Sequence, residues 1–578
     1  MDSSPLLPLP TSPSHSSSSA SMVGVVDYCG KPASRSSSGR WTAALFIIGV
    51  EIAERFAYYG ISSNLITYLT GPLRESTVEA AVAVNTWSGV ASMLPLAGAF
   101  VADSYLGRYR TILLASMLYI LVRCLLSLIF KGFAIHTAGL GLLTLSSALP
   151  SLYPPKCSVS DVGACAPNNF QVGFFYFAIY LVALAQGGHK PCTQAFGADQ
   201  FDENDPQESI SRSSFFNWWY ASLCLGSAVT IILLNYVQDN ISWALGFGIP
   251  LVSMGLALIL FLLGTKMYRF YQLEGESPFL RIGKSFVTLV KKHMARSHGL
   301  TGSQTSTSDA EGGLGRVEFE KDEAADTIQL EEAKGVLRLV PIWATCLIYG
   351  VVFAQSSTFF TKQGSTLDRR IGSNFQVPPA ALQSFIGISI VAFIPVYDRI
   401  LVPVTRKFTK IPTGITQLQR IGAGMMLSLI SMGIAGLVEV KRLKTAKDYG
   451  LIDQPKTPIP MSLWWLVPQY ILYGIADVFT MVGLQEFFYD QVPDALRSLG
   501  LALYLSIFGI GNFISSFLIA FINKASSRSG ASWFSDNLNR AHLDYFYWLL
   551  AGLSAAELIL YVYFARDYAY KKKQNASL

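Results

Sequence analysis

One apolar stretch near the N-terminus carries charged side chains at a spacing that could move a proton. The run EIAERFAYYG places Glu51, Glu54, Arg55 and Tyr58 at positions i, i+3, i+4 and i+7, with Tyr59 next in the chain. These intervals put the four side chains on one helix face, where Glu51 can pair with Arg55. Pairing with Arg keeps a carboxylate charged, whereas desolvation without that partner favours its protonation. This stripe could therefore work as a proton switch.

The rest of the chain is too apolar for an ordinary soluble protein. Of its 578 residues, 51% are hydrophobic and 14% are charged, against about 25% charged in soluble domains. Its apolar runs reach the ~20 residues that a helix needs to cross a bilayer, and Glu51 falls near the middle of the first run. Each mid-membrane charge costs about 2.5–3.5 kcal/mol. Besides a proton switch, a purely structural ion pair remains an alternative for Glu51, Glu54 and Arg55.

We predict an all-α membrane protein with 12 transmembrane helices in two six-helix bundles. The predicted spans are 41–68, 83–106, one within 110–152, 171–196, 215–237, 243–264, 336–360, 378–402, 418–440, 463–488, 499–521 and 545–564. The predicted divisions are a disordered cytosolic arm (1–40), an N-terminal bundle (41–264), a cytosolic linker (265–334), a C-terminal bundle (335–566) and a cytosolic tail (567–578). Two bundles joined by a charged linker are typical of transporters with a solute path between the bundles.

The stretch 111–152 does not fit this pattern. It is mostly apolar, interrupted only by Arg123, Lys131 and His136, which makes it too long for one span and poor in turn residues for two. Two spans here would invert everything downstream. We therefore predict that Val122 to Ala138 is an insertion, from alternative splicing or from an error in the coding sequence.

The positions of Lys and Arg predict the orientation in the membrane. Both termini are expected in the cytosol, because the cationic residues gather in loops that alternation places on one side. These residues are Arg108, Arg110, Arg406, Lys407, Lys410, Arg566 and Lys571 to Lys573. The loop predicted after the ninth span is an exception, since it holds Lys441, Arg442, Lys444 and Lys447.

Metal, cofactor and nucleic-acid sites are not expected. The seven cysteines show no CxxC motif and no metal-ligand spacing with histidine, and the net charge of +6 forms no basic stripe with exposed aromatic residues. Cys157 and Cys165 share a short polar loop and could form a disulfide if that loop faces a lumen. In the N-terminal arm, Asp2, Leu6 and Leu7 fit the acidic dileucine pattern that sorting adaptors read.

Three further groups are candidates for function. Between spans two and three, the loop from Gly98 to Arg110 holds Asp103, Gly107, Arg108 and Arg110, a pattern that resembles the cytosolic gate motif of the major facilitator superfamily; the alternative is an ordinary positive-inside loop. The second group is Lys190, which follows His189 at the end of the fourth span and could instead snorkel to the interface. The third is Asp477 in the tenth span, an acid with no close cationic partner in sequence, for which polar packing is the alternative.

Together these motifs resemble one family. The run EIAERFAYYG is similar to the ExxER helix of the proton-dependent oligopeptide transporters, and residues 41–566 resemble their plant branch, the nitrate and peptide transporter family of the major facilitator superfamily. The other similar segments are GGHKP to DQFD (187–202), FFNWWY (215–220), PIWAT (341–345) and LDRRIG (367–372).

The resemblance implies roles for these residues. Glu51, Glu54 and Arg55 would couple the proton, Lys190 would pair with the acids, and Tyr58 and Tyr59 would line the cavity.

Three positions bear on the substrate that the resemblance implies. Asp477 stands where the family usually has Glu to meet a substrate amino group or to support gating. Cys224 replaces an Asn that helps peptide-carrying members to hold peptides, and Phe353 stands near the position where some nitrate-carrying members have His. Under this resemblance, nitrate would be held through Arg55 and Lys190.

The expected function is proton-coupled symport of a small polar solute by alternating access, with nitrate as the leading substrate. The alternatives are a di- or tripeptide, another small organic solute, and a proton-independent facilitator. An enzyme is not expected, because the six histidines form no HExxH motif and no clear catalytic pair, and a channel or receptor would not need the gate motif. The vacuolar membrane is the expected location, with the plasma membrane as the alternative.

Overall fold

The structure is a computed structural model that describes residues 21–120, 139–148, 167–202, 205–271, 333–372, 375–411, 414–492, 497–528 and 532–568, together with 287 and 331. Several predicted features lie outside these residues. They are the sorting pattern at Asp2, Leu6 and Leu7, the insertion at 122–138 and the disulfide between Cys157 and Cys165.

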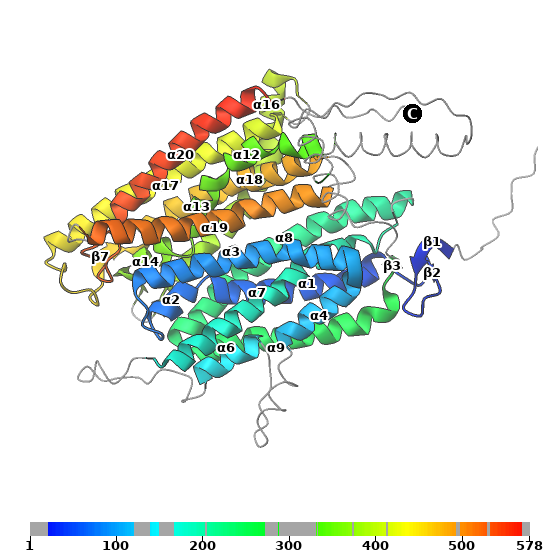
Figure 1. Cartoon of the computed structure of the whole chain (residues 1–578), viewed down its shortest axis with the longest axis horizontal. Coiled ribbons are helices and arrows are strands. Elements are labelled where there is room, and N and C mark those ends of the chain that lie inside the picture. The colour runs from blue at the N-terminus through cyan, green and yellow to red at the C-terminus, as the bar shows by residue number, and fades with distance from the viewer. Residues whose placement is uncertain are drawn as a thin grey trace, which may run out of the picture.

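The first half of the chain forms a bundle of helices, which Figure 1 shows below in blue to green. Its helices are α1 (Arg40–Ser62), α2 (Leu65–Thr70), α3 (Thr77–Val101), the π-helix η1 (Ala102–Leu106), α4 (Arg108–Ile120), α6 (Gly139–Ala148), α7 (Asn169–Ala198), α8 (Pro206–Asn240), α9 (Trp243–Leu263) and the short 3-10 helix η2 (Gly264–Met267). Strands β1 (Ser21–Val26), β2 (Pro32–Ser34) and β3 (Phe270–Tyr271) form a sheet in the order β2-β1-β3, with both pairings antiparallel.

The second half forms another bundle, above the first in Figure 1. Its helices are α12 (Val340–Ala344), α13 (Leu347–Gln355), α14 (Phe359–Ser365), η3 (Pro379–Gln383), α15 (Ser384–Val396), the π-helix η4 (Tyr397–Leu401), α16 (Val402–Thr409), α17 (Gln417–Asp448), η5 (Leu463–Leu466), α18 (Val467–Gln491), α19 (Arg497–Ser527) and α20 (Leu543–Arg566). Short strands pair β4 (Leu367–Asp368) with β7 (Ile459–Ser462), and β5 (Arg370–Ile371) with β6 (Phe375–Gln376).

The all-α membrane architecture is confirmed. Among the described residues, eight helices are long and apolar enough to cross a membrane, or nine if the bent pair Ala333–Ala344 and Leu347–Ser365 forms one span. Helix α1 has the length but carries Glu51, Glu54 and Arg55 in its interior. The short helices α4 and α6 both pack against α7 and α9. Their 13 and 10 residues together have the length of one span, at ~1.5 Å per residue.

The two halves repeat two irregularities, as expected of a transporter built from related bundles. The first predicted span breaks between α1 and α2, and the seventh breaks between α13 and α14. In addition, η1 and η4 are each a five-residue π-helix with an aspartate, Asp103 or Asp398, in second position. Such π-turns inside helices are rare and occur often at functional sites.

Glycine pairs let the helices around the centre approach closely. A Cβ on Gly98 of α3 would lie 1.9 Å from the carbonyl oxygen of Gly187 on α7. In the second half, a Cβ on Gly350 of α13 would lie 2.6 Å from the carbonyl oxygen of Ile507 on α19. Small residues at such crossings are the usual means of bringing backbones together in lipid. They place α7 beside α3, and α13 beside α19.

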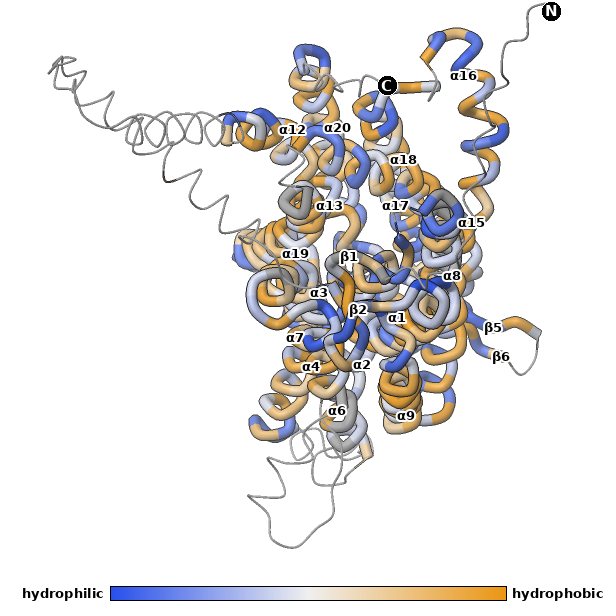
Figure 2. Tube along the Cα trace, turned by 90° about the vertical axis from the view of Figure 1, so that its right-hand side faces the viewer, coloured by the Kyte–Doolittle hydropathy of each residue, from blue (hydrophilic) through white to orange (hydrophobic). Residues whose placement is uncertain are grey.

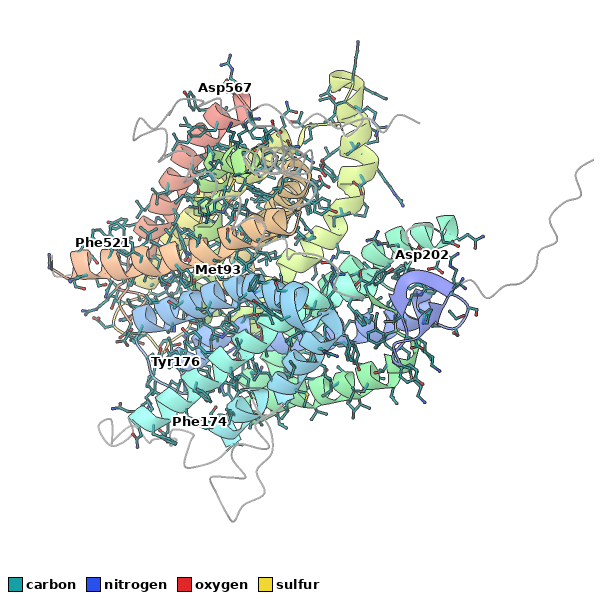
Figure 3. The ribbon with its side chains drawn as sticks, turned by 45° about the vertical axis from the view of Figure 1, so that its right-hand side comes forward. Met93, Phe174, Tyr176, Asp202, Phe521 and Asp567 are labelled. Carbon is teal, nitrogen blue, oxygen red and sulfur yellow. The ribbon has the colours of Figure 1, made fainter. Side chains whose placement is uncertain are left out.

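The halves contact each other unevenly along the bundle. We call the end with β1, β2 and β3 the sheet end, and the charge distribution predicts that it is cytosolic. Figure 1 shows the helices of the halves diverging toward this end, at the right. Toward the opposite end, the Thr77 N–H donates to Asp536 at 2.7 Å, and Lys362 donates to the Thr70 hydroxyl at 3.1 Å. Nearer the middle, Met93 of α3 lies against Gly509 of α19 (Figure 3).

Two predictions differ from the structure. The arm 1–40 was predicted to be disordered, but residues 21–39 form β1, β2 and ordered turns, with Met22, Val25 and Ala33 buried together. The loop predicted after the ninth span is a continuation of α17 to Asp448. Arg442 is therefore a buried helical residue paired with Glu439 at 2.6 Å, not a loop charge that opposes the orientation rule.

The packing of α4 and α6 generates a prediction about the segment between them. Removing Val122 to Ala138 should leave a protein that inserts and folds, because α4 would lead into α6 along the same neighbours, α7 and α9. We expect the deletion variant to elute as a single detergent-solubilised peak with a Tm no lower than that of the full chain. As a control, a deletion of equal length inside α9 should abolish folding, and aggregation of the first variant would contradict the prediction.

Candidate functional site

The charged stripe of α1 forms a buried cluster. The Arg55 Nε lies 2.8 Å from Glu51 Oε1 and 3.2 Å from Glu54 Oε2, and all three side chains are less than a tenth exposed. Within the described residues, the second carboxylate oxygen of Glu51 is buried with no hydrogen-bond partner. A buried carboxylate oxygen without a donor is costly, so the cluster is not in its most stabilised arrangement.

Helix α7 places a second cation beside this cluster. Lys190 is half-buried and interacts electrostatically with Arg55, Glu54 and Glu51. Its neighbour His189 is fully buried, 2.7 Å from the Ser116 hydroxyl of α4, and its ring also interacts with Arg55. The four predicted proton-coupling residues therefore come together from two helices, as two carboxylates and two cations.

Aromatic residues connect the cluster to the second half. Tyr58 stacks on Trp87 of α3 with ring centroids 5.6 Å apart, and Tyr59 packs edge-on against Tyr58. Tyr504 of α19 interacts electrostatically with both Tyr59 and Asp477. Tyr504, which the sequence reasoning did not identify, is thus near Tyr59 of the first half and Asp477 of the second half.

In the second half, Asp477 lies in an aromatic enclosure. Its carboxylate accepts a hydrogen bond from the Tyr349 hydroxyl, and the side chain is 3% exposed. Tyr349 stacks on Tyr473, and Phe353 packs against Phe508 at 5.1 Å between ring centroids. Within the described residues, Asp477 has no cationic partner. The predicted residues Phe353 and Asp477 thus belong to one cluster on α13, α18 and α19.

Glu557 of α20 is a buried acid that sequence reasoning missed. Its Oε1 accepts hydrogen bonds from the backbone N–H groups of Ile348 at 2.7 Å and Tyr349 at 3.2 Å. These are orphan donors in the first turn of α13, so Glu557 caps the N-terminal end of this helix, at the bend between α12 and α13. Like Asp477, Glu557 is an acid within an apolar span, and this pattern makes it recognisable from the sequence.

The structure shows contacts for part of the predicted gate motif. Gly107 has φ +77°, and its N–H donates to the Ala102 carbonyl, closing η1. Arg108 donates to both carboxylate oxygens of Asp199 at 2.6 and 2.5 Å, which ties α4 to the end of α7. Asp103 lies within η1, and Arg110 is exposed. The motif therefore joins helix ends within the first half.

A second buried ion pair, between Glu439 and Arg442 on α17, is fully compensated. Arg442 donates to both oxygens of Glu439, to the Leu538 carbonyl at 2.7 Å and to Asn539 at 3.0 Å. Gln363 donates to Glu439 at 2.7 Å. Because every charge here has several partners, this pair is suited to holding helices in place rather than to exchanging protons. Among the described residues, no group of acidic, His and Cys side chains could hold a metal ion.

Comparison with known sequences identifies relatives along most of the chain. The sequence model described as the POT family matches residues 126–534. Protein NRT1/PTR FAMILY 5.10 of Arabidopsis thaliana is 59% identical over 557 residues, covering 95% of this chain and 96% of that protein. Protein NRT1/PTR FAMILY 5.13 of the same plant is 52% identical over 569 residues, covering 95% of this chain and 97% of that protein.

Solved structures agree with this fold at low sequence identity. An auto-inhibited POT family peptide transporter superposes with a TM-score of 0.66 at 20% identity, covering 93% of this chain and 99% of that one. The POT family transporter PepTSo gives 0.65 at 20% identity, covering 91% of this chain and 97% of that one. At such identities the likeness supports the fold alone.

The capping contact of Glu557 generates a prediction about stability. Glu557→Leu leaves two buried N–H groups without an acceptor and should lower the free energy of unfolding by about 2 kcal/mol. Glu557→Gln should retain most of the stability, because its amide oxygen can accept from the same donors. Thermal melting of the purified variants in detergent measures both, and a Leu variant as stable as wild type would contradict the capping role.

Proposed function

Because the chain belongs to the POT family of transporters, we propose that it moves a small anionic solute, with nitrate as the leading substrate, across a membrane together with protons. The observation that carries this proposal is the buried cluster of Glu51, Glu54, Arg55 and Lys190. It offers both the carboxylates that can take up protons and the cations that can hold an anion.

The balance of charges in the cluster supplies the coupling. With both carboxylates ionised, the charges of Arg55 and Lys190 are neutralised and leave nothing to attract an anion. When a proton binds to Glu51 or Glu54, one positive charge loses its partner and can hold a small anion instead. Proton and anion then enter together, because each makes the other's binding more favourable.

Alternating access follows from the two bundles. The halves are hydrogen-bonded toward the end opposite the sheet and diverge toward the sheet end (Figure 1), so in the predicted orientation these contacts between the halves lie on the side away from the cytosol. Tyr504 interacts with groups of both halves and is placed to respond to a change of charge in either. Rocking of one bundle against the other would expose the cluster to the other side.

One observation favours a second candidate substrate class. Asp477 has no cationic partner among the described residues and is surrounded by aromatic rings, an environment that suits a substrate ammonium group. A solute with an amino group and an anionic group, such as an amino acid derivative or a peptide, could bridge Asp477 and Arg55.

The vacuolar membrane, reached through a sorting adaptor that reads Asp2, Leu6 and Leu7, is the proposed location, with the plasma membrane as the alternative.

Neutralising the proton acceptor should abolish acid stimulation. In oocytes that express the chain with Asp2, Leu6 and Leu7 changed to Ala for surface delivery, we expect external acid to increase the uptake of isotope-labelled nitrate. Glu54→Gln should reduce this uptake at least about tenfold, because the side chain cannot exchange a proton. Glu486→Gln is the matched control, since Glu486 also pairs with an arginine, Arg420, but is half-exposed. Equal pH-dependent nitrate uptake by all three proteins, at equal surface expression, would contradict proton coupling through Glu54.

Asp477 should distinguish the two substrate classes. If an amino group binds at Asp477, Asp477→Asn should reduce transport of amino-bearing solutes at least about tenfold more than it reduces nitrate transport. Isotope uptake of nitrate and of a dipeptide in the same oocytes measures this ratio. Wild-type uptake of nitrate without uptake of any amino-bearing solute would reject the second class, and equal losses for both solutes would assign Asp477 to gating.

A further inference from the structure

Residues 21–39 form a folded segment at the sheet end, which we call the arm. Strand β1 pairs with β2 inside the arm and with β3, which follows the last helix of the first half. The Gly39 N–H donates to the Met267 carbonyl, and the Arg40 N–H donates to the Gln200 carbonyl, both at 2.7 Å. The arm therefore joins the ends of α1, α7 and α9.

A buried ion pair anchors the base of the arm. Arg269 is fully buried and donates to Glu208 at 2.6 Å, while Arg40 donates to the same carboxylate at 2.9 Å. Burial raises the pKa of Glu208, but hydrogen bonds from Arg269, the Asp202 N–H and Arg40 outweigh it and lower the pKa to about 2. The stabilisation from ionised Glu208 is present above its ordinary pKa and is lost only as the pH falls through about 2. Cytosolic pH changes therefore leave this anchor intact.

The outer part of the arm is held by one arginine. Arg35 bonds to Asp202 and, at 3.2 Å, to Asp205, both in the turn between α7 and α8. Its side chain is 33% exposed, in contrast to the buried Arg269. Figure 3 shows Asp202 beside the arm. Since partly exposed pairs contribute little each, the contact of Arg35 is a weak charged link that another anion can exchange.

Two exposed serines directly follow this arginine. Ser36 and Ser37 occupy the turn after β2, and the Ser37 hydroxyl makes no hydrogen bond within the described residues. Each residue lies within two Cα steps of ~3.8 Å from Arg35. By contrast, the Ser38 hydroxyl is buried and donates to the Ser34 carbonyl at 2.7 Å. Ser36 and Ser37 are thus accessible hydroxyls beside a cation that two aspartates share.

We propose that Ser36 and Ser37 are phosphorylation sites and that their modification releases the arm. A basophilic serine kinase would transfer the γ-phosphoryl group of ATP to the serine oxygen. The new P–O bond forms as the bond to the leaving ADP breaks, and the hydroxyl proton passes to the kinase base. The phosphate carries a charge of about −1.5 to −2. It competes with Asp202 and Asp205 for Arg35 and repels both carboxylates.

The position of the arm gives its release a consequence. Viewed from the sheet end, β1 and β2 overlap the middle of the molecule (Figure 2), although the segments that hold them, β3 and the ends of α7 and α9, belong to the first half. The ends of the halves must approach each other there when the sheet end closes. The docked arm therefore stabilises the conformation with diverging halves, and its release allows closure. This regulation rests on the proposed transport cycle, but the release of the arm itself does not.

A spin label on Cys29 tests the release directly. Cys29 is exposed in the turn between β1 and β2, and the other six cysteines can be replaced by Ala in the full chain. In nanodiscs, Ser36→Asp combined with Ser37→Asp should increase the ratio of mobile to immobile label about fivefold, as expected for losing two partly exposed pairs. Arg35→Ala should have the same effect, and the combined variant should show no further increase. The exposed Ser365, changed to Asp, is the control for added charge.

The release of the arm and its effect on transport are tested by different outcomes. Phosphorylation of the purified protein with a basophilic kinase and ATP should modify Ser36 or Ser37, as mapped by mass spectrometry, and should mobilise the label like the Asp variant. Unchanged label mobility in the Asp and Arg35→Ala variants would overturn the proposed release of the arm, whatever the protein transports. Increased label mobility together with a maximal transport rate no higher than that of wild type would overturn the proposal that the docked arm slows closure of the sheet end.

Discussion

A charge in the middle of a bilayer is costly unless another group compensates it, and the arrangement of this molecule depends on that constraint. Helix α1 carries two acids and an arginine through the membrane, so neighbouring helices must supply the remaining compensation. Helix α7 does so with Lys190, and the close contact of Gly98 with Gly187 brings α7 against α3, the other neighbour of the site. The packing of the first half thus serves to place opposite charges within reach of one another.

The degree of compensation distinguishes a structural pair from a switch. Glu439 and Arg442 are fully buried and have partners on every side, so no proton or solute is needed to complete them. Within the part of the chain that the structure describes, an oxygen of Glu51 in the α1 cluster lacks a donor, and Asp477 in the second half has a tyrosine but no cation as a partner. Under the proposed function, the proton and the solute complete these sites. Tyr504 lies near Tyr59 of the first half and Asp477 of the second half.

The sequence predicts those features that depend on local spacing. The stripe of α1 and most membrane spans follow from periodicity and hydrophobic length, whereas the positions of Lys190 and Asp477 relative to their partners depend on tertiary packing. The extent of α17 was misjudged because its last turns are cationic, although Gly450 with φ +67° marks a helix end just beyond Asp448. The order of the arm could not be predicted from its Ser-rich composition, because β1 pairs with β3, more than 240 residues away along the chain. Glu557 was recognisable by the rule that identified Asp477.

The central claim is that the buried cluster of α1 and α7 must bind a proton before the transported solute can bind. To test it, the purified protein is placed in liposomes that contain a trapped pH-sensitive dye. An inward gradient of the transported solute is then applied, with no initial pH difference across the membrane. Proton coupling through the cluster predicts that solute entry acidifies the interior in wild type and that Glu54→Gln abolishes the acidification. Solute entry without any change of internal pH in the wild type, or undiminished acidification in the variant, would contradict it.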